Sequence, residues 1–175
     1  MAACLLSGRA DEAAALAAFR ALDARGLASP AALAGAGGEE VASALEESGY
    51  PRAGPAAAVL WRACRTLLER HGGSLSRLAA EADGLDELGA RLAGLARGVG
   101  AATVACFLRP LRPFWPAASD LPLSPAAEAA AEHLDLVWDG SPDLEAALER
   151  LGRRACLRGR PERCPLGEEC PRRPA

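Results

Sequence analysis

The chain has 175 residues, half of them hydrophobic, which is enough to bury one core or to divide it between two small helical subdomains. No apolar run reaches the roughly 18 residues that a membrane span needs, and the apolar patch in residues 1–6 follows no basic segment. These features exclude a membrane-spanning class, and we expect a soluble, cytoplasmic protein.

Charge alternates along the chain, although the net charge of −3 disfavours nucleic acid as a partner of the molecule as a whole. Segment 91–113 carries four arginines and no acid, and segment 150–175 carries eight arginines against three glutamates. Between them, segment 114–149 carries eight acids and no arginine. The two basic segments could hold a polyanion locally; ordinary solvated helix faces are the alternative that charge leaves open.

Helical periodicity dominates the chain, because alanine-rich stretches carry leucine at helical spacing and none alternates β-branched residues as a strand does. We therefore predict an all-α fold. The predicted helices are 11–25, 30–35, 38–48, 54–72, 75–82, 84–95, 100–110, 124–134 and 142–153.

Serine and glycine predict where several helices begin and end. A serine directly before a proline suits an N-cap followed by a first-turn proline, and three positions show this pair: Ser29, Ser124 and Ser141. Glycines predict helix ends at three places: Gly26, Gly49 and Gly72-Gly73. The four prolines of segment 109–122 exclude a continuous helix and predict an ordered loop or linker, with Phe114 beside Trp115 as an apolar anchor.

The six cysteines fall into two groups. Three stand alone in apolar helical stretches, where a buried thiol behaves as a small hydrophobic group, so we predict that they belong to the core: Cys4, Cys64 and Cys106. The other three cluster in the arginine-rich tail: Cys156, Cys164 and Cys170. In an intracellular protein such a cluster favours metal ligation over disulfides.

Residues 94–108 predict a helix end, a tight turn at Gly98-Val99-Gly100 and a second, apolar helix. Such a hairpin presents backbone N–H groups at a helix N-terminus to an anion, and glycine permits both the turn and the close approach of a phosphate. A plain connection between two helices is the alternative.

This turn resembles the helix-hairpin-helix of base-excision DNA glycosylases, and the resemblance to endonuclease III-like proteins covers nearly the whole chain. It also rests on Leu5-Leu6-Ser7, residues 29–33, 39–49 and 64–73, Asp120 and the cysteine tail. The resemblance implies that the hairpin binds the DNA backbone without reading sequence, through Arg97, Gly98, Val99, Gly100 and Ala101.

The resemblance also implies a glycosylase fold with three parts. A barrel-like helical subdomain would span 1–113, with the hairpin at about 84–110; further helices would complete a second subdomain at 114–155, and a small cysteine loop would span 156–175.

Two positions bear on the chemistry that the family performs. The lyase-competent branch carries a lysine just past the second hairpin glycine, where this chain has Ala102. A Schiff base needs an amine, and the chain contains no lysine, so we expect no lysine-dependent lyase. Asp120 corresponds to the family's catalytic aspartate, although Leu121-Pro122-Leu123 departs from the family motif; a loop aspartate capping the next helix is the alternative.

Two further motifs depart from the family pattern. Arg9 stands where the family's intercalating loop carries glutamine, and it could fill an opened base stack or bind phosphate; a solvated arginine is the alternative. The tail spacing C-x7-C-x5-C lacks one of the four cysteines of iron-sulfur glycosylases. It implies a 4Fe-4S cluster with an open or non-cysteine corner, or a relict loop without metal, and disfavours zinc.

Together these features predict a monomeric duplex-DNA-binding protein of the base-excision-repair type. It would be a monofunctional glycosylase with Asp120 as the catalytic carboxylate, or a non-catalytic DNA-binding or iron-sulfur protein on the same scaffold. A third interpretation is an unrelated alanine-rich helical interaction protein.

Overall fold

A computed structural model describes residues 1–8 and 10–171, and within them the chain forms ten α-helices, five short 3-10 turns and no β-strand. The predicted all-α class is confirmed. The described helices include none with the length and hydropathy that crossing a membrane requires. Two compact units divide the chain: an N-terminal unit, Met1–Asp120, and a C-terminal unit, Leu121–Ala175.

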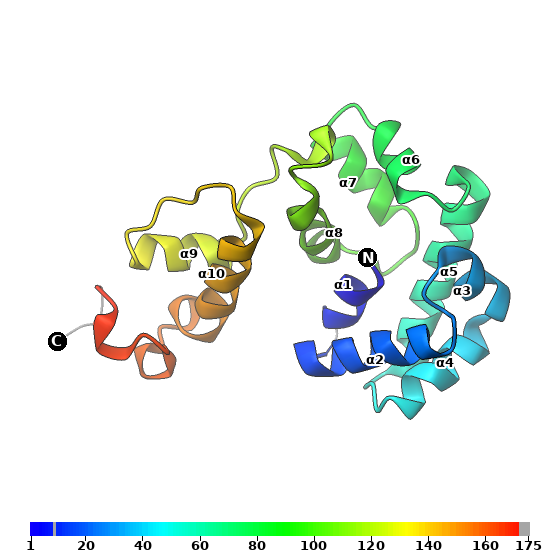
Figure 1. Ribbon diagram of the computed structural model, residues 1–175, viewed down its shortest axis with the longest axis horizontal. Helices are drawn as coiled ribbons and strands as arrows, with labels where there is room; N and C mark the ends of the chain where they lie inside the picture. Colours follow the sequence, from blue (N-terminus) through cyan, green and yellow to red (C-terminus); the bar gives the residue numbers. More distant parts are fainter. Residues whose placement is uncertain (9, 172–175) are drawn as a thin grey trace. The chain divides into compact units, whose positions relative to one another are not determined.

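The N-terminal unit holds eight α-helices, drawn in blue to green in Figure 1. They are α1 (Ala2–Ser7), α2 (Glu12–Ala24), α3 (Pro30–Ala36), α4 (Gly38–Glu47), α5 (Ala53–His71), α6 (Leu75–Ala80), α7 (Leu85–Ala93) and α8 (Ala101–Leu108). Two 3-10 turns follow, η1 (Arg109–Leu111) and η2 (Pro116–Ala118), where the prolines had predicted a break.

The long helix α5 organises this unit, because it contacts α1, α3, α4 and α6. Trp61 on α5 donates an indole hydrogen bond to the Ala34 carbonyl at 3.1 Å, which joins α5 to α3. Tyr50 donates its hydroxyl to the Leu6 carbonyl at 2.6 Å, which fixes the end of α1. Helix α1 in turn contacts both α2 and α8, so the hairpin helix rests on the same core.

The predicted caps are confirmed. The hydroxyls of Ser29, Ser124 and Ser141 each accept a hydrogen bond from the backbone N–H three residues on, at 3.1, 3.1 and 3.3 Å. Asp11 caps α2 in the same way at 2.8 Å. Gly26, Gly49 and Gly72 follow helix ends with positive φ, as expected for residues that stop a helix.

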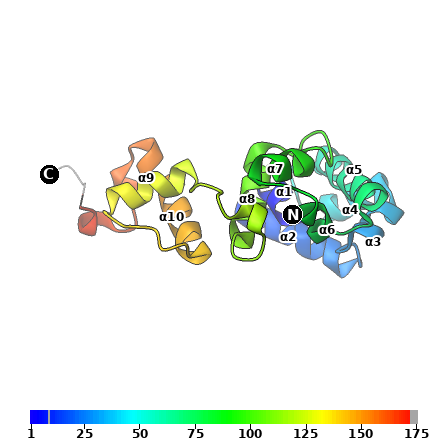
Figure 2. The same ribbon diagram turned by 90° about the horizontal axis from the view of Figure 1, so that it is seen from above.

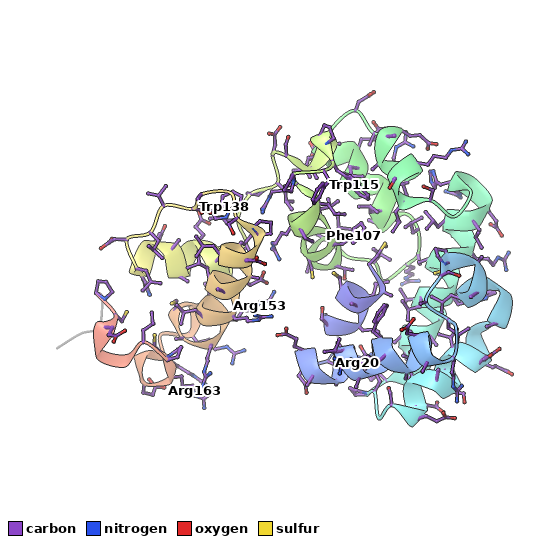
Figure 3. The ribbon with its side chains drawn as sticks, viewed as in Figure 1. Arg20, Phe107, Trp115, Trp138, Arg153 and Arg163 are labelled. Atoms are coloured by element: carbon purple, nitrogen blue, oxygen red, sulfur yellow. The ribbon has the colours of Figure 1, made fainter. Side chains whose placement is uncertain are left out.

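Two sequence predictions about apolar side chains are wrong. Phe114 does not anchor the loop, because it is 73% exposed. The neighbouring Trp115 anchors the loop instead, because it packs edge-on against Phe107 with ring centroids 5.7 Å apart (Figure 3). Three cysteines assigned to the core are only half-buried: Cys4, Cys64 and Cys106.

The C-terminal unit is a helix pair, α9 (Pro125–His133) and α10 (Pro142–Arg154), followed by three 3-10 turns. The turns are η3 (Cys156–Arg158), η4 (Pro161–Arg163) and η5 (Gly167–Glu169). Figures 1 and 2 both show α9 and α10 side by side. Small side chains line their contact, where Leu148 of α10 packs on Ala127, Ala130 and Ala131 of α9.

Gly152 sets the distance between these two helices. A Cβ atom at this position would lie 1.8 Å from the Ala126 carbonyl oxygen, which is backbone and cannot rotate away. Only glycine fits there, so the close α9–α10 contact requires a residue without a side chain at this position.

We expect Gly152→Ala to lower the free energy of unfolding by about 3 kcal/mol, because one methyl group must push two backbones apart. Urea unfolding followed by far-UV circular dichroism measures this. The matched control is Gly89→Ala on α7, where a Cβ would meet no atom within 4 Å. That substitution should raise stability by about 0.5–1 kcal/mol through helix propensity. Equal effects of the two substitutions would contradict the close contact.

Candidate nucleic-acid interface

The turn between α7 and α8 has a buried central residue and two exposed glycines. Val99 is 5% exposed and its backbone N–H donates to the Ala96 carbonyl at 3.0 Å, so the turn is anchored in the core. The glycines on either side, Gly98 and Gly100, are exposed. Gly98 has a φ of +111°, a conformation that favours glycine, whereas Gly100 is extended, with φ −94° and ψ 171°.

The N-terminus of α8 lacks a cap. Its N-cap residue, Gly100, has no side chain to accept a hydrogen bond, and the first turn contains no acid. The first intrahelical bond runs from the Val104 N–H to the Gly100 carbonyl at 3.0 Å. The backbone N–H groups of Ala101, Ala102 and Thr103 therefore have no acceptor within residues 1–8 and 10–171.

Arginine supplies a positive charge beside this turn at only one of four positions in segment 91–113. Arg97 is exposed, and its side chain makes no ion pair or hydrogen bond with the described residues. Arg112 is only 8% exposed, and Arg109 is half-buried. Arg91 pairs with Glu87 at 2.8 Å and with Glu81 at 3.3 Å. Most of this basic segment thus belongs to the scaffold rather than to an open cationic face.

A network of charged side chains fixes α7, the helix that leads into the turn. Glu81 accepts from Arg77 at 3.2 Å and from Arg91 at 3.3 Å, and lies 3.0 Å from the His71 ring nitrogen at the end of α5. Partial desolvation would raise the pKa of Glu81, but the bonds from Arg77 and His71 outweigh it and lower the pKa.

The Glu87 side chain stabilises the N-terminal end of α7. Its carboxylate accepts the Asp83 backbone N–H at 2.8 Å, and this bond, together with the one from Arg91, lowers the pKa of Glu87. The carboxylate therefore stays ionised and holds the first turn of α7 in place. The turn at the opposite end of α7 is positioned by this fixed helix.

Asp120 and Ala102, the two positions that bear on catalysis, are both exposed. Asp120 is the last residue of the N-terminal unit, and its carboxylate accepts a hydrogen bond from the Ser119 hydroxyl at 3.3 Å. It does not cap α9, because the Ser124 hydroxyl occupies that role. That alternative for Asp120 is therefore wrong, and its catalytic role stays a prediction. Arg9 lies outside the described residues.

The three tail cysteines are half-buried and reduced. Cys156 packs against the α9–α10 core, and desolvation together with the nearby Cys164 and Cys170 thiols raises its pKa. Cys164 and Cys170 thus each influence Cys156. Across the described chain, however, no three His, Cys, Asp or Glu side chains gather into a set that could hold a metal ion. Thiolates suit an iron-sulfur cluster, and a cluster on these three cysteines stays a prediction.

The C-terminal unit carries exposed arginines, in the segment where the charge pattern of the sequence indicated a basic region. Four of its arginines are exposed, and their side chains make no ion pair with the part of the chain that the structure describes: Arg154, Arg158, Arg160 and Arg163. We call these four the tail arginines. Arg153, labelled in Figure 3, by contrast pairs with Glu149 on α10 at 2.5 Å.

Comparisons with protein-family models, with curated proteins and with solved structures return no match. The resemblance to endonuclease III-like proteins therefore stays a prediction from motifs, to be judged by experiment.

We expect a cluster, if it assembles, to require all three tail cysteines. Anaerobically purified protein should then show broad visible absorbance from thiolate-to-iron charge transfer, which serine at Cys156, Cys164 or Cys170 removes. Cys64→Ser, outside the tail, is the control and should leave the spectrum unchanged. Folded protein that is colourless and free of iron would favour the relict loop.

Proposed function

We propose that this chain is a duplex-DNA-binding protein of the base-excision-repair type that contacts phosphates through the turn between α7 and α8. The observation that carries this proposal is the uncapped N-terminus of α8 beside the exposed, unpaired Arg97. A phosphate placed there would satisfy backbone donors that the protein leaves without an acceptor, at the positive end of a helix dipole.

The chemistry of this contact favours affinity without sequence reading. Backbone N–H groups and an arginine recognise phosphate oxygens, which every nucleotide carries. Arg97 is the one side chain of the turn that is long enough to contact a base edge. Gly100 leaves the amides of the first turn without a capping side chain, and a Cβ there would meet no atom within 4 Å. The turn thus suits positioning a duplex rather than selecting its sequence.

The tail arginines offer a separate phosphate-binding surface on the C-terminal unit. Four exposed guanidinium groups without ion-pair partners bring charge that a polyanion can neutralise. Each phosphate contact releases counterions from the duplex, so affinity should fall steeply as salt rises. A protein of net charge −3 can bind DNA in this way because its arginines are concentrated in particular segments of the chain.

We propose further that the fold is a shortened helix-hairpin-helix glycosylase fold. Support comes from the order of helices, from the anchored turn at Gly98–Gly100 and from the motifs of the sequence. A monofunctional glycosylase would use the Asp120 carboxylate to stabilise positive charge that develops on the deoxyribose as the base leaves.

A non-catalytic DNA-binding protein is the second candidate, and the surroundings of Asp120 favour it. The carboxylate is exposed and sits in a turn, where water screens its charge from a developing cation. The position that would hold the lyase lysine is an exposed alanine, Ala102. DNA binding is common to both candidates, and only a test for base release separates them.

We expect Gly100→Asp to weaken duplex binding about tenfold or more, because its carboxylate would take the amides of α8 and repel phosphate. The same change should raise the unfolding temperature, because aspartate is a better N-cap than glycine. Fluorescence anisotropy with a labelled duplex, at several salt concentrations, and thermal unfolding measure the two effects.

Gly84→Asp is the matched control, since it adds the same charge at an uncapped helix start, that of α7, at the end away from the turn. It should change stability without a comparable loss of DNA affinity. If binding is indifferent both to Gly100→Asp and to added salt, the turn does not bind phosphate.

We expect no covalent imine between this protein and an abasic or damaged duplex, because no lysine is present to form one. Borohydride should therefore trap no adduct on a denaturing gel. Any base release should be abolished by Asp120→Asn, with DNA binding intact or tighter, because the change removes a negative charge.

Asp139→Asn, another loop aspartate, is the control for lost charge. A trapped adduct would overturn the mechanism, and release that survives Asp120→Asn would overturn the carboxylate assignment. Absence of release from every damaged duplex tried would favour the non-catalytic candidate.

A further inference from the structure

The N-terminal unit contains a hydrophobic pocket of about 290 Å³ that is lined by residues of α1, α2, α3, α5 and α6 (Figure 1). Its inner part is lined by five leucines that are themselves buried: Leu5, Leu33, Leu60, Leu67 and Leu95. These side chains therefore border an open space as well as one another. Packed protein interiors keep few voids larger than a water molecule, so a space of this size is unusual.

Small side chains leave this space open. Ala63 and Cys64 are adjacent on α5, and both line the pocket, where longer side chains would fill part of it. Side chains that border an empty space lose the dispersion contacts that a neighbour on that side would give. A ligand of matching shape would restore these contacts.

The mouth of the pocket is lined by residues that solvent reaches. Met1, Phe19, Pro30 and Leu75 are half-buried, and Ala28 is exposed. They come from separate parts of the N-terminal unit and surround the buried leucines. A small molecule can therefore enter from solvent and contact the inner leucines.

The chemistry of the lining disfavours a charged ligand. Among the described residues, none with a charged side chain lines the pocket. Burial raises the pKa of the Cys64 thiol to about 11, so this thiol is uncharged at neutral pH. Burial also lowers the pKa of the Met1 amino group, which favours its neutral form. A charged ligand would lose its hydration here without gaining an ionic partner.

A second hollow in the same unit has the opposite chemistry. It has a volume of about 520 Å³ and lies between α5 and α7, where Arg70, His71, Glu87 and Arg91 contribute to its lining. Polar groups of this kind hold water by hydrogen bonds, whereas a cavity lined by leucine stays dry. The hydrophobic pocket is therefore the one of the two that suits an apolar ligand.

We propose that the hydrophobic pocket binds a neutral, hydrophobic small molecule. An apolar cavity of roughly 150 Å³ admits benzene, and this pocket has about twice that volume. The ligand is therefore about the size of a bicyclic hydrocarbon ring system. The pocket shares no lining residue with the Gly98–Gly100 turn, so the inference does not depend on DNA binding.

Aminonaphthalene is a suitable probe, because it is uncharged at neutral pH and its fluorescence shifts to shorter wavelength in apolar surroundings. Titration into the full chain should show saturable, one-to-one binding, and saturating probe should raise the unfolding temperature. Aminonaphthalenesulfonate adds a negative charge to the same rings. It should bind about tenfold more weakly or worse, because the pocket offers its charge no partner.

Ala63→Leu should fill part of the pocket and weaken aminonaphthalene binding about tenfold or more. Ala58→Leu is the matched control, since it makes the same change at a half-buried position of α5 that does not line the pocket. It should leave the affinity for the probe unchanged. Neither substitution should alter duplex-DNA affinity, which separates a failure here from a failure of the proposed function. Equal losses in the two variants, or no saturable binding to the wild type, would overturn the proposal.

Alkylation of Cys64 tests occupancy in the wild-type chain, even if Ala63→Leu fails to fold. The protein is treated with iodoacetamide above neutral pH, with and without saturating aminonaphthalene, and its peptides are quantified by mass spectrometry. The probe should slow modification of Cys64 several-fold and leave the rates at Cys156, Cys164 and Cys170 unchanged. Equal rates at Cys64 with and without probe would overturn the proposal, because a ligand in the pocket would cover the thiol that lines it.

Discussion

Close approach of helix backbones is the condition on which this structure depends. Alanine and leucine make up most of the buried core, and large aromatic side chains contribute little to it. Alanine buries little area, so the helices must approach closely to exclude water and gain dispersion contacts. Gly152 against the Ala126 carbonyl is the extreme case, where the contact leaves no room for a methyl group.

The same condition explains why the turn between α7 and α8 can be both rigid and open. Leu92 and Leu108 are fully buried and hold α7 and α8 in the core, and Val99 anchors the residue between the two glycines. The backbone N–H groups in the first turn of α8 have no capping side chain. Because the turn is anchored in the core, these donors stay in fixed positions. Because these donors are already fixed, binding of an anionic ligand costs the protein little conformational entropy.

Arginine has different roles in segment 91–113 and in the C-terminal unit. In segment 91–113 the arginines mainly serve the scaffold, through the Glu81 and Glu87 network and through burial of Arg112. The tail arginines are exposed: Arg154 ends α10, and the other three lie in or beside the short 3-10 turns that follow it. Counting charges along the sequence could not distinguish these two uses.

The sequence by itself determined the features that depend on near neighbours in the chain. Helical periodicity, the serine-proline starts, the glycine ends and the break in segment 109–122 could all be predicted, because capping and backbone geometry act over a few residues. The glycine turn and the positions of Asp120 and the tail cysteines could be named from motifs for the same reason.

Only the tertiary structure decided which of these residues face solvent and which meet one another. Arg112 is buried and Arg97 is exposed, and Trp115 rather than Phe114 anchors the loop. These outcomes depend on the register of helices that are distant in sequence. That register is set by packing across the core, which no local pattern of residues encodes.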